Sequence, residues 1–145
     1  MNAFSRKAWL AISAALVAVY VLGAYSSAAF AADVKVVLAG DQEVPPVKSA
    51  GSGSGTITVA ADKSVSGSVA TKGISGTAAH IHEAAAGKNG SVIIPLTKEG
   101  DNTWKVPAGA KLSDAQFASF EAGNLYINVH TAANPNGELR GQLKP

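Results

Sequence analysis

The chain has 145 residues, with 12 lysines and arginines against 10 aspartates and glutamates, and it contains no cysteine. A chain without cysteine has neither a disulfide framework nor a thiolate metal site. Arg6 and Lys7 lie in a predicted leader, and their removal takes the formal charge from +2 to 0. The mature chain therefore lacks a basic stripe for nucleic acid and a polybasic patch for anionic lipid.

The first 31 residues predict a secretory signal peptide. Arg6 and Lys7 supply a positive start, residues 8–24 are apolar apart from Ser13, and residues 29–31 read Ala-Phe-Ala. This pattern predicts cleavage after Ala31. The alternative is an uncleaved membrane anchor, but the apolar run falls short of the ~20 residues that a spanning helix needs. We expect a secreted or periplasmic protein, residues 32–145, with no stable membrane insertion after cleavage.

The first half of the mature chain predicts three strands. Residues 34–38 read as a strand that ends before the prolines at 45–46, since proline cannot donate to a sheet. Residues 49–55 are rich in Gly and Ser and predict a loop. Residues 56–60 and 65–71 both alternate apolar and polar side chains around a short turn, which predicts a hairpin.

The second half predicts further strands and one helix. Strands are expected at residues 78–82, 92–96, 102–106, 125–131 and 138–143. A helix is expected at 113–122, because Ser113 and Gln116 form a capping box and Gly123 suits the position after the helix. Its buried stripe is Leu112, Phe117 and Phe120. Seven or eight short strands with one helix predict an all-β fold, either an antiparallel β-sandwich or a Greek-key barrel.

All three histidines fall on two of these strands. Side chains alternate along a strand, so His80 and His82 share one face, as do Tyr126, Asn128 and His130. The apolar residues between them are expected to face the core, which places the histidines on the outer face. If the two strands are neighbours, three imidazoles converge, and three histidines with water suit Zn(II) or Cu(II). The alternative is that the histidines only hydrogen-bond neighbouring strands and loops.

Two carboxylates are the next candidates for this site. Glu43 and Glu138 suit either a fourth ligand or an acceptor that orients an imidazole. The simpler interpretation pairs Glu138 with Arg140 on the same strand face, and Glu43 with Arg140 across the fold, because carboxylates away from solvent usually pair.

Three long motifs in this order resemble the CHRD domain, the repeat unit first described in chordin, in its single-domain exported bacterial form. The matching stretches are residues 38–46, residues 78–82 with Gly87 and Asn89-Gly90, and residues 125–131 with 134–143. The resemblance implies an immunoglobulin-like or superoxide-dismutase-like sandwich, which makes an all-β, antiparallel Greek-key β-sandwich with one short helix the expected fold. It implies little about activity, and the animal parent acts by binding signalling proteins.

These observations predict an exported binding module rather than an enzyme. Its partner is a copper or zinc ion held by His80, His82 and His130, or, in the alternative, a protein bound by a metal-free interaction or adhesion module. A metalloenzyme with an open coordination position is the third hypothesis.

Overall fold

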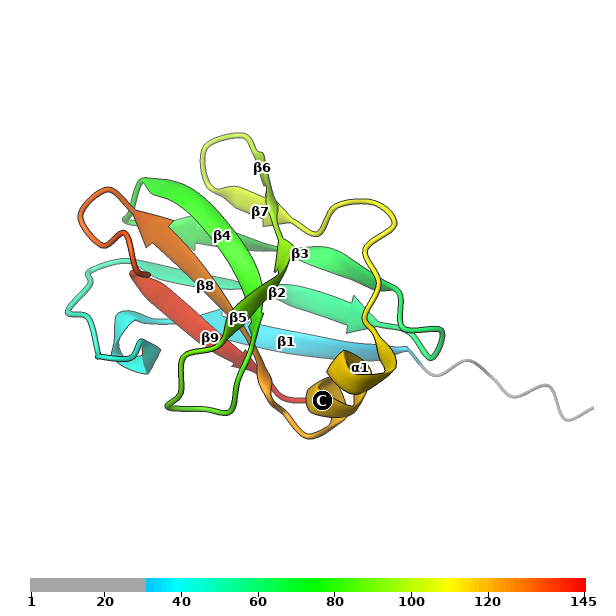
Figure 1. Ribbon diagram of the computed structural model, residues 1–145. Coiled ribbons are helices and arrows are strands. Elements are labelled where there is room, and N and C mark those ends of the chain that lie inside the picture. Colours follow the sequence, from blue (N-terminus) through cyan, green and yellow to red (C-terminus); the bar gives the residue numbers. More distant parts are fainter. Residues whose placement is uncertain (1–30) are drawn as a thin grey trace, which may run out of the picture.

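The computed structural model describes residues 31–145 (Figure 1), and the predicted signal peptide lies outside the described residues apart from Ala31. The elements are β1 (Ala32–Leu38), the 3-10 helix η1 (Gly40–Gln42), β2 (Ser52–Val59), β3 (Val65–Lys72), β4 (Gly76–Glu83), β5 (Ser91–Pro95), β6 (Thr97–Glu99), β7 (Thr103–Lys105), α1 (Asp114–Glu121), β8 (Leu125–Thr131) and β9 (Leu139–Leu143).

Two antiparallel sheets form a sandwich, which confirms the predicted fold class. One sheet has the strand order β1-β2-β3-β7-β6 and the other has the order β5-β4-β8-β9. Most neighbouring strands are consecutive in sequence, but β3 and β7, and β4 and β8, are far apart, because the chain crosses between the two sheets. Figure 1 shows the two layers facing each other, with α1 at one end.

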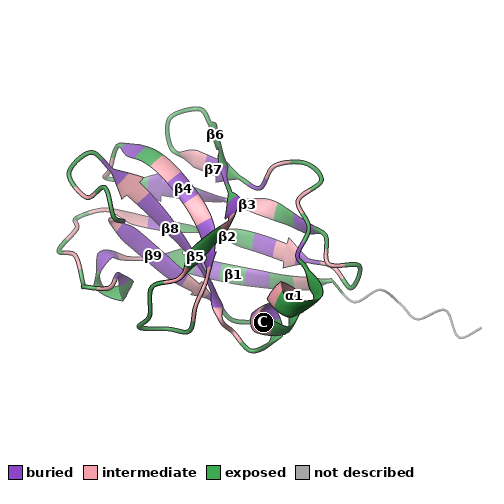
Figure 2. Ribbon diagram, viewed as in Figure 1, coloured by how far each residue is buried: buried purple, intermediate pink, exposed green. Residues whose placement is uncertain are grey.

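The core lies between the sheets and follows the alternation of the sequence. Strand β1 alternates buried Val34, Val36 and Leu38 with exposed neighbours, and β2 does the same at Ile57 and Val59. Strand β8 differs, since almost all of its residues are buried on both faces (Figure 2). The outer face of β8 is therefore covered by something other than the opposite sheet.

The predicted Gly/Ser loop at residues 49–55 is wrong from Ser52 onward. Strand β2 begins at Ser52 and pairs with both β1 and β3. The glycines are needed here because the neighbouring backbone is close: a Cβ at Gly55 would lie 2.0 Å from the Ser68 carbonyl oxygen. The short strand β6 was also not predicted.

The helix and its capping box are confirmed, whereas Phe117 of the predicted buried stripe is only half-buried. Ser113 accepts a hydrogen bond from the Gln116 backbone N–H, and the Gln116 side chain accepts one from the Ser113 N–H. Gly123 follows the helix with a φ of 73°, a left-handed conformation that glycine adopts without strain. Within residues 31–145, no helix is long and apolar enough to cross a membrane.

Candidate metal site

The pairing of β4 with β8 brings the three histidines together on the outer face. His80 lies opposite Asn128 and His82 lies opposite Tyr126 in this antiparallel pair. His130 lies opposite Ala78, which is two residues before His80 on β4, so the His130 ring reaches His80 diagonally across the strand pair. The residues between them, including Ala79 and Ile127, are at most 1% exposed and face the core, as the alternation predicted.

The ring nitrogens of the three histidines converge. One nitrogen from each ring lies within 4.8 Å of the other two. His80 Nδ1 and His130 Nε2 are 3.0 Å apart. Two nitrogens at this separation, each ~2.0–2.1 Å from one zinc ion, would subtend an angle of about 90–100° at the ion. That angle suits two cis ligands of a single metal.

Backbone carbonyl groups orient two of the rings. His82 Nδ1 lies 2.9 Å from the Gly90 carbonyl oxygen, and His130 Nδ1 lies 2.8 Å from the Pro135 carbonyl oxygen. A carbonyl only accepts, so both Nδ1 atoms carry the proton and both Nε2 atoms keep a free lone pair. Ligand histidines are commonly held in this way. In the metal-free protein, His80 Nδ1 then donates to His130 Nε2.

His82 is the most constrained of the three rings. It is 8% exposed and stacks on Tyr126 with ring centroids 4.8 Å apart and an interplanar angle of 9°. The Arg140 guanidinium covers the Tyr126 ring, 3.5 Å from its centroid. Arg140 also donates to the carbonyl oxygens of Lys88 and Ala85, which fastens the loop that carries Gly90.

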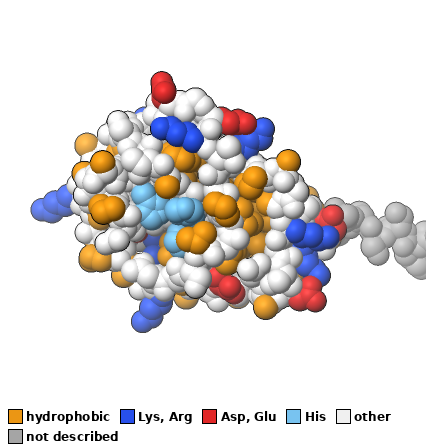
Figure 3. Space-filling view, turned by 45° about the horizontal axis from the view of Figure 1, so that its top comes forward, with side chains coloured by type: hydrophobic (Ala, Val, Ile, Leu, Met, Phe, Trp, Pro, Cys, Tyr) orange, Lys and Arg blue, Asp and Glu red, His pale blue; other side chains and the backbone are white. Residues whose placement is uncertain are grey.

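The site opens to solvent at the other two rings. His80 and His130 are partly exposed, and Figure 3 shows the histidines gathered in the middle of one face with hydrophobic side chains around them. His80 and His130 thus form the solvent side of the cluster, whereas His82 Nε2 is buried behind them.

Burial keeps two of these histidines neutral. The pKa of His80 lies below its ordinary value of 6.5, first because of burial and then because of the neighbouring His130 and His82. Burial also lowers the pKa of His82. The neutral imidazole is the form that binds metal, so a metal at pH 7 would not have to displace a proton from a charged ring.

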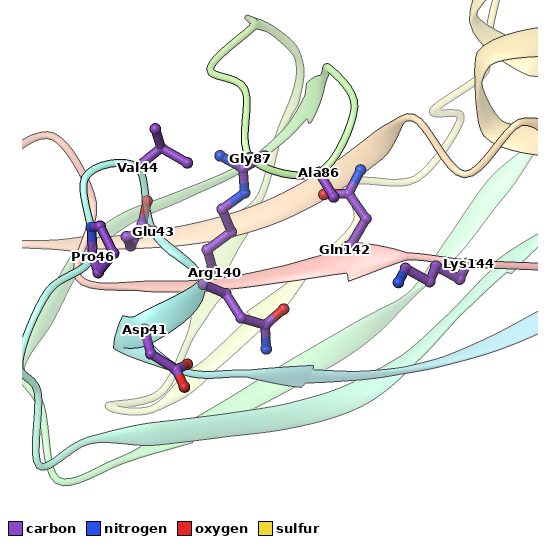
Figure 4. Close-up of a pocket in the computed structure, with 10 residues that line it drawn as sticks. Asp41, Glu43, Val44, Pro46, Ala86, Gly87, Arg140, Gln142 and Lys144 are labelled. Carbon is purple, nitrogen blue, oxygen red and sulfur yellow. The ribbon is translucent and has the colours of Figure 1, made fainter.

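Glu43, Asn128 and His82 each carry a buried polar atom without a hydrogen-bond partner. Glu43 Oε1, Asn128 Oδ1 and His82 Nε2 are buried, and no protein group bonds to them. Glu43 is 5% exposed, and burial raises its pKa, although the Arg140 charge opposes this rise. Figure 4 shows Glu43 on the loop before Pro46, with Arg140 rising from β9 toward Gly87. Glu43, Pro46, Gly87 and Arg140 line a surface pocket of about 420 Å³, which includes neither Asn128 nor a histidine.

The predicted ion pairs of Arg140 are wrong. The salt bridges of residues 31–145 are Lys63–Asp114 and Lys105–Glu99, so neither Glu43 nor Glu138 pairs directly with Arg140. Arg140 instead donates to the Ala85 and Lys88 carbonyls and lies over the Tyr126 ring. Glu138 accepts hydrogen bonds from Ser49, Thr131 and Asn134, which account for its lowered pKa. Glu138 is thus held by hydroxyl and amide donors and is not part of the histidine cluster.

The family model of the CHRD domain matches residues 34–143, nearly the whole described chain. The chain belongs to the CHRD domain family. Membership indicates an extracellular-type module, and it matches the resemblance that the three sequence motifs carry. No curated protein and no solved structure matches the chain. The histidine cluster therefore has to be interpreted from its own geometry.

The sequence did not reveal the groups that orient the rings. The Gly90 and Pro135 carbonyls are backbone atoms, which any residue type supplies, so no side-chain pattern marks them. Arg140 carried a usable signal: it lies opposite Asn128 on β9, a polar position on the outer face of the sheet. Its side chain is nevertheless only 1% exposed, because the loop over it closes the face.

Proposed function

We propose that this CHRD domain is an exported binding module that holds a copper or zinc ion through His80, His82 and His130. The observation that supports it most directly is the convergence of three ring nitrogens within 4.8 Å. Two of the rings are oriented by carbonyls so that their free Nε2 atoms can bind an ion. The role proposed is binding, not catalysis.

The chemistry of the donors supports the choice of metal. The chain has no cysteine, so its nitrogen donors are imidazoles and any further ligand is oxygen. Imidazole suits zinc and copper, whereas calcium and magnesium take oxygen ligands. Three histidines with water in a fourth position form a familiar zinc arrangement.

Export is part of the same proposal. The positive start, the apolar run and Ala29-Phe30-Ala31 support cleavage after Ala31. N-terminal sequencing of the protein collected outside the cytoplasm should begin at Ala32 or within a residue or two of it. A membrane-bound form that retains Met1 would contradict this part of the proposal.

Thermal unfolding with and without metal tests the binding. Ligand that binds only the folded state stabilises it by about 2.7 kcal/mol at a hundredfold excess over Kd. Cu(II) or Zn(II) should therefore raise the Tm of residues 32–145, and EDTA should reverse the rise. His80→Ala and His130→Ala should lose most of it while remaining folded without metal, since the core does not depend on the ion.

Gln142→Ala is the matched control. Gln142 lies on the same outer face, opposite Tyr126, and donates to the Ala84 and Gly123 carbonyls instead of contacting a histidine. This variant should keep the metal response of the wild type. If neither metal shifts the wild type, or if the histidine variants respond as the wild type does, the histidines form no metal site.

One observation favours the alternative, a metal-free interaction module. His80 and His130 already hydrogen-bond each other, and His82 and His130 each bond a carbonyl, as purely structural histidines would. In that case the histidine variants would lose stability in the absence of metal, and chelators would leave the wild type unchanged.

A further inference from the structure

Three unpartnered acceptors lie together beside the histidines. Glu43 Oε1, Asn128 Oδ1 and His82 Nε2 are buried and have no hydrogen-bond partner. A buried polar atom without a partner costs about 1–3 kcal/mol. While Glu43 is ionised, all three atoms are acceptors, and no rearrangement among them satisfies the group. A cation would satisfy the acceptors that face it.

The orientation of the Asn128 amide is fixed by its surroundings. Asn128 Nδ2 lies 3.5 Å from the Asn136 carbonyl oxygen, and a carbonyl can only accept. A Cβ placed at Gly137 would lie 2.7 Å from this Nδ2 and 2.5 Å from Glu43 Oε1, so the amide nitrogen and the carboxylate are on the same side. A flipped amide would set its oxygen against both acceptors. Asn128 Oδ1 is therefore on the side of His82.

Two acceptors, Asn128 Oδ1 and His82 Nε2, then lie on the same side. Asn128 lies opposite His80 in the β4–β8 pair, on the same outer face as His82 and diagonally across from it. His82 Nδ1 donates its proton to the Gly90 carbonyl, so the buried Nε2 presents a lone pair on the same face as the amide oxygen. Two lone pairs that face each other in a buried place require a positive charge or a donor between them.

Glu43 contributes through Asn128 and through its charge. The Asn128 amide and the Arg140 guanidinium both favour the ionised form of Glu43 and so lower its pKa, against the effect of burial. Arg140 also disfavours positive charge at His82. An ionised Glu43 would offset this repulsion of a cation and would hold the Asn128 Nδ2 group toward itself.

We infer that Asn128 Oδ1 is a fourth, oxygen donor for the ion that the proposed function places at the three histidines, and that Glu43 is the positioning residue behind it. The inference rests on that proposed function. The site is then a three-nitrogen, one-oxygen site for a divalent ion. Glu43 and Asn128, whose unpartnered buried oxygens cost stability in the metal-free fold, are then required for metal binding.

Zinc affinity, measured by competition with a chromophoric chelator, tests the inference together with the visible spectrum of bound Co(II). Asn128→Leu removes the oxygen but keeps the volume, and should weaken Zn(II) binding on the order of tenfold or more. It should also change the Co(II) spectrum. Asn128→Asp keeps an oxygen and should bind Zn(II) at least as tightly as the wild type.

Glu43→Gln gives a second, independent measurement. It should weaken Zn(II) binding by about 10–100-fold, as the loss of outer partners of a metal site does. It should also raise the Tm of the metal-free protein, because an unpaired buried carboxylate is removed. A structural role alone would instead lower the Tm. Glu138→Gln is the control: it breaks a satisfied carboxylate cluster, lowers the Tm and leaves the Co(II) spectrum unchanged.

The two proposals fail in different ways. If wild-type protein binds no Zn(II), the three-histidine site itself is wrong and the inference falls with it. If the wild type binds Zn(II) and loses it in His80→Ala, while Asn128→Leu keeps the wild-type affinity and Co(II) spectrum, only the fourth donor is wrong. If Glu43→Gln leaves Zn(II) affinity unchanged, Glu43 has no positioning role.

Discussion

On the inner side of β8, Leu125, Ile127 and Val129 are at most 1% exposed and pack in the core, whereas on the outer side Tyr126, Asn128 and His130 meet polar loops. The inner side contains only hydrocarbon and stabilises the fold. The outer side includes a buried amide oxygen without a partner. The comparison suggests that one strand carries both tasks, with stability on one face and the proposed binding chemistry on the other.

Ile127→Ala should give the largest effect, and only on the inner side. Ile127 is 0% exposed, and truncating such a residue costs about 2–5 kcal/mol because it leaves a cavity. Urea unfolding of the metal-free protein should show a loss of this size. Val37→Ala is the control, because Val37 is 64% exposed and its truncation should stay within about 0.5 kcal/mol.

The same variant also separates the two faces. Under conditions where Ile127→Ala remains folded, its Zn(II) affinity should match that of the wild type, since Ile127 points away from the histidines. A large loss of Zn(II) affinity would show that the inner and outer faces of β8 are not independent, which would contradict the division of tasks between them.

Gly137→Ala should give the next largest effect, and it acts on the outer side. Gly137 has a φ of 128°, which an L-residue adopts only with strain, and a Cβ there would lie 2.5 Å from Glu43 Oε1. The strain should cost about 1–3 kcal/mol. The displaced carboxylate should also weaken Zn(II) binding. Gly109→Ala is the control: its φ is 79°, but nothing lies within 4 Å of the added Cβ, so it should lose stability and keep its affinity.

Alternation predicted which residues of β4 and β8 share a face, because a strand's geometry is local. It placed Ile127 and Val129 in the core and His80, His82 and His130 outside, and the structure confirms this. The helix cap was equally local, since Ser113 and Gln116 are three residues apart.

The interactions that the sequence did not reveal are long-range. Glu43 reaches the outer face on a loop that precedes Asn128 by 85 positions in the printed sequence. The hydrogen-bond partners of Arg140 could not be predicted from charge alone. Guanidinium donors bond to carbonyls as well as to carboxylates, and the loop over β8 supplies carbonyls. The Gly/Ser segment was misassigned because β-propensity does not register how closely two backbones approach.

The smallest effect we predict is a pH dependence of stability that belongs to the outer side alone. Burial lowers the pKa of His82, and the Gly90 carbonyl acts against it. Burial also lowers the pKa of His80, followed by the charges of His130 and His82. The unfolded chain therefore binds protons at a higher pH than the folded one.

Stability should thus be fully present above about pH 6.5 and should fall as the pH drops from 6.5 through the lowered pKa values of the folded state. Glu43 acts in the opposite sense, because its pKa is raised on folding from 4.5. The measurement is therefore cleanest in metal-free Glu43→Gln, by urea unfolding between pH 7.5 and pH 5.5. Adding His80→Ala to that variant should flatten the decline, since it removes one of the two shifted histidines. A stability that is constant or rises as the pH falls would show that His80 and His82 are not held in the neutral form. The distinction between the two faces of the β4–β8 pair would then rest on packing alone.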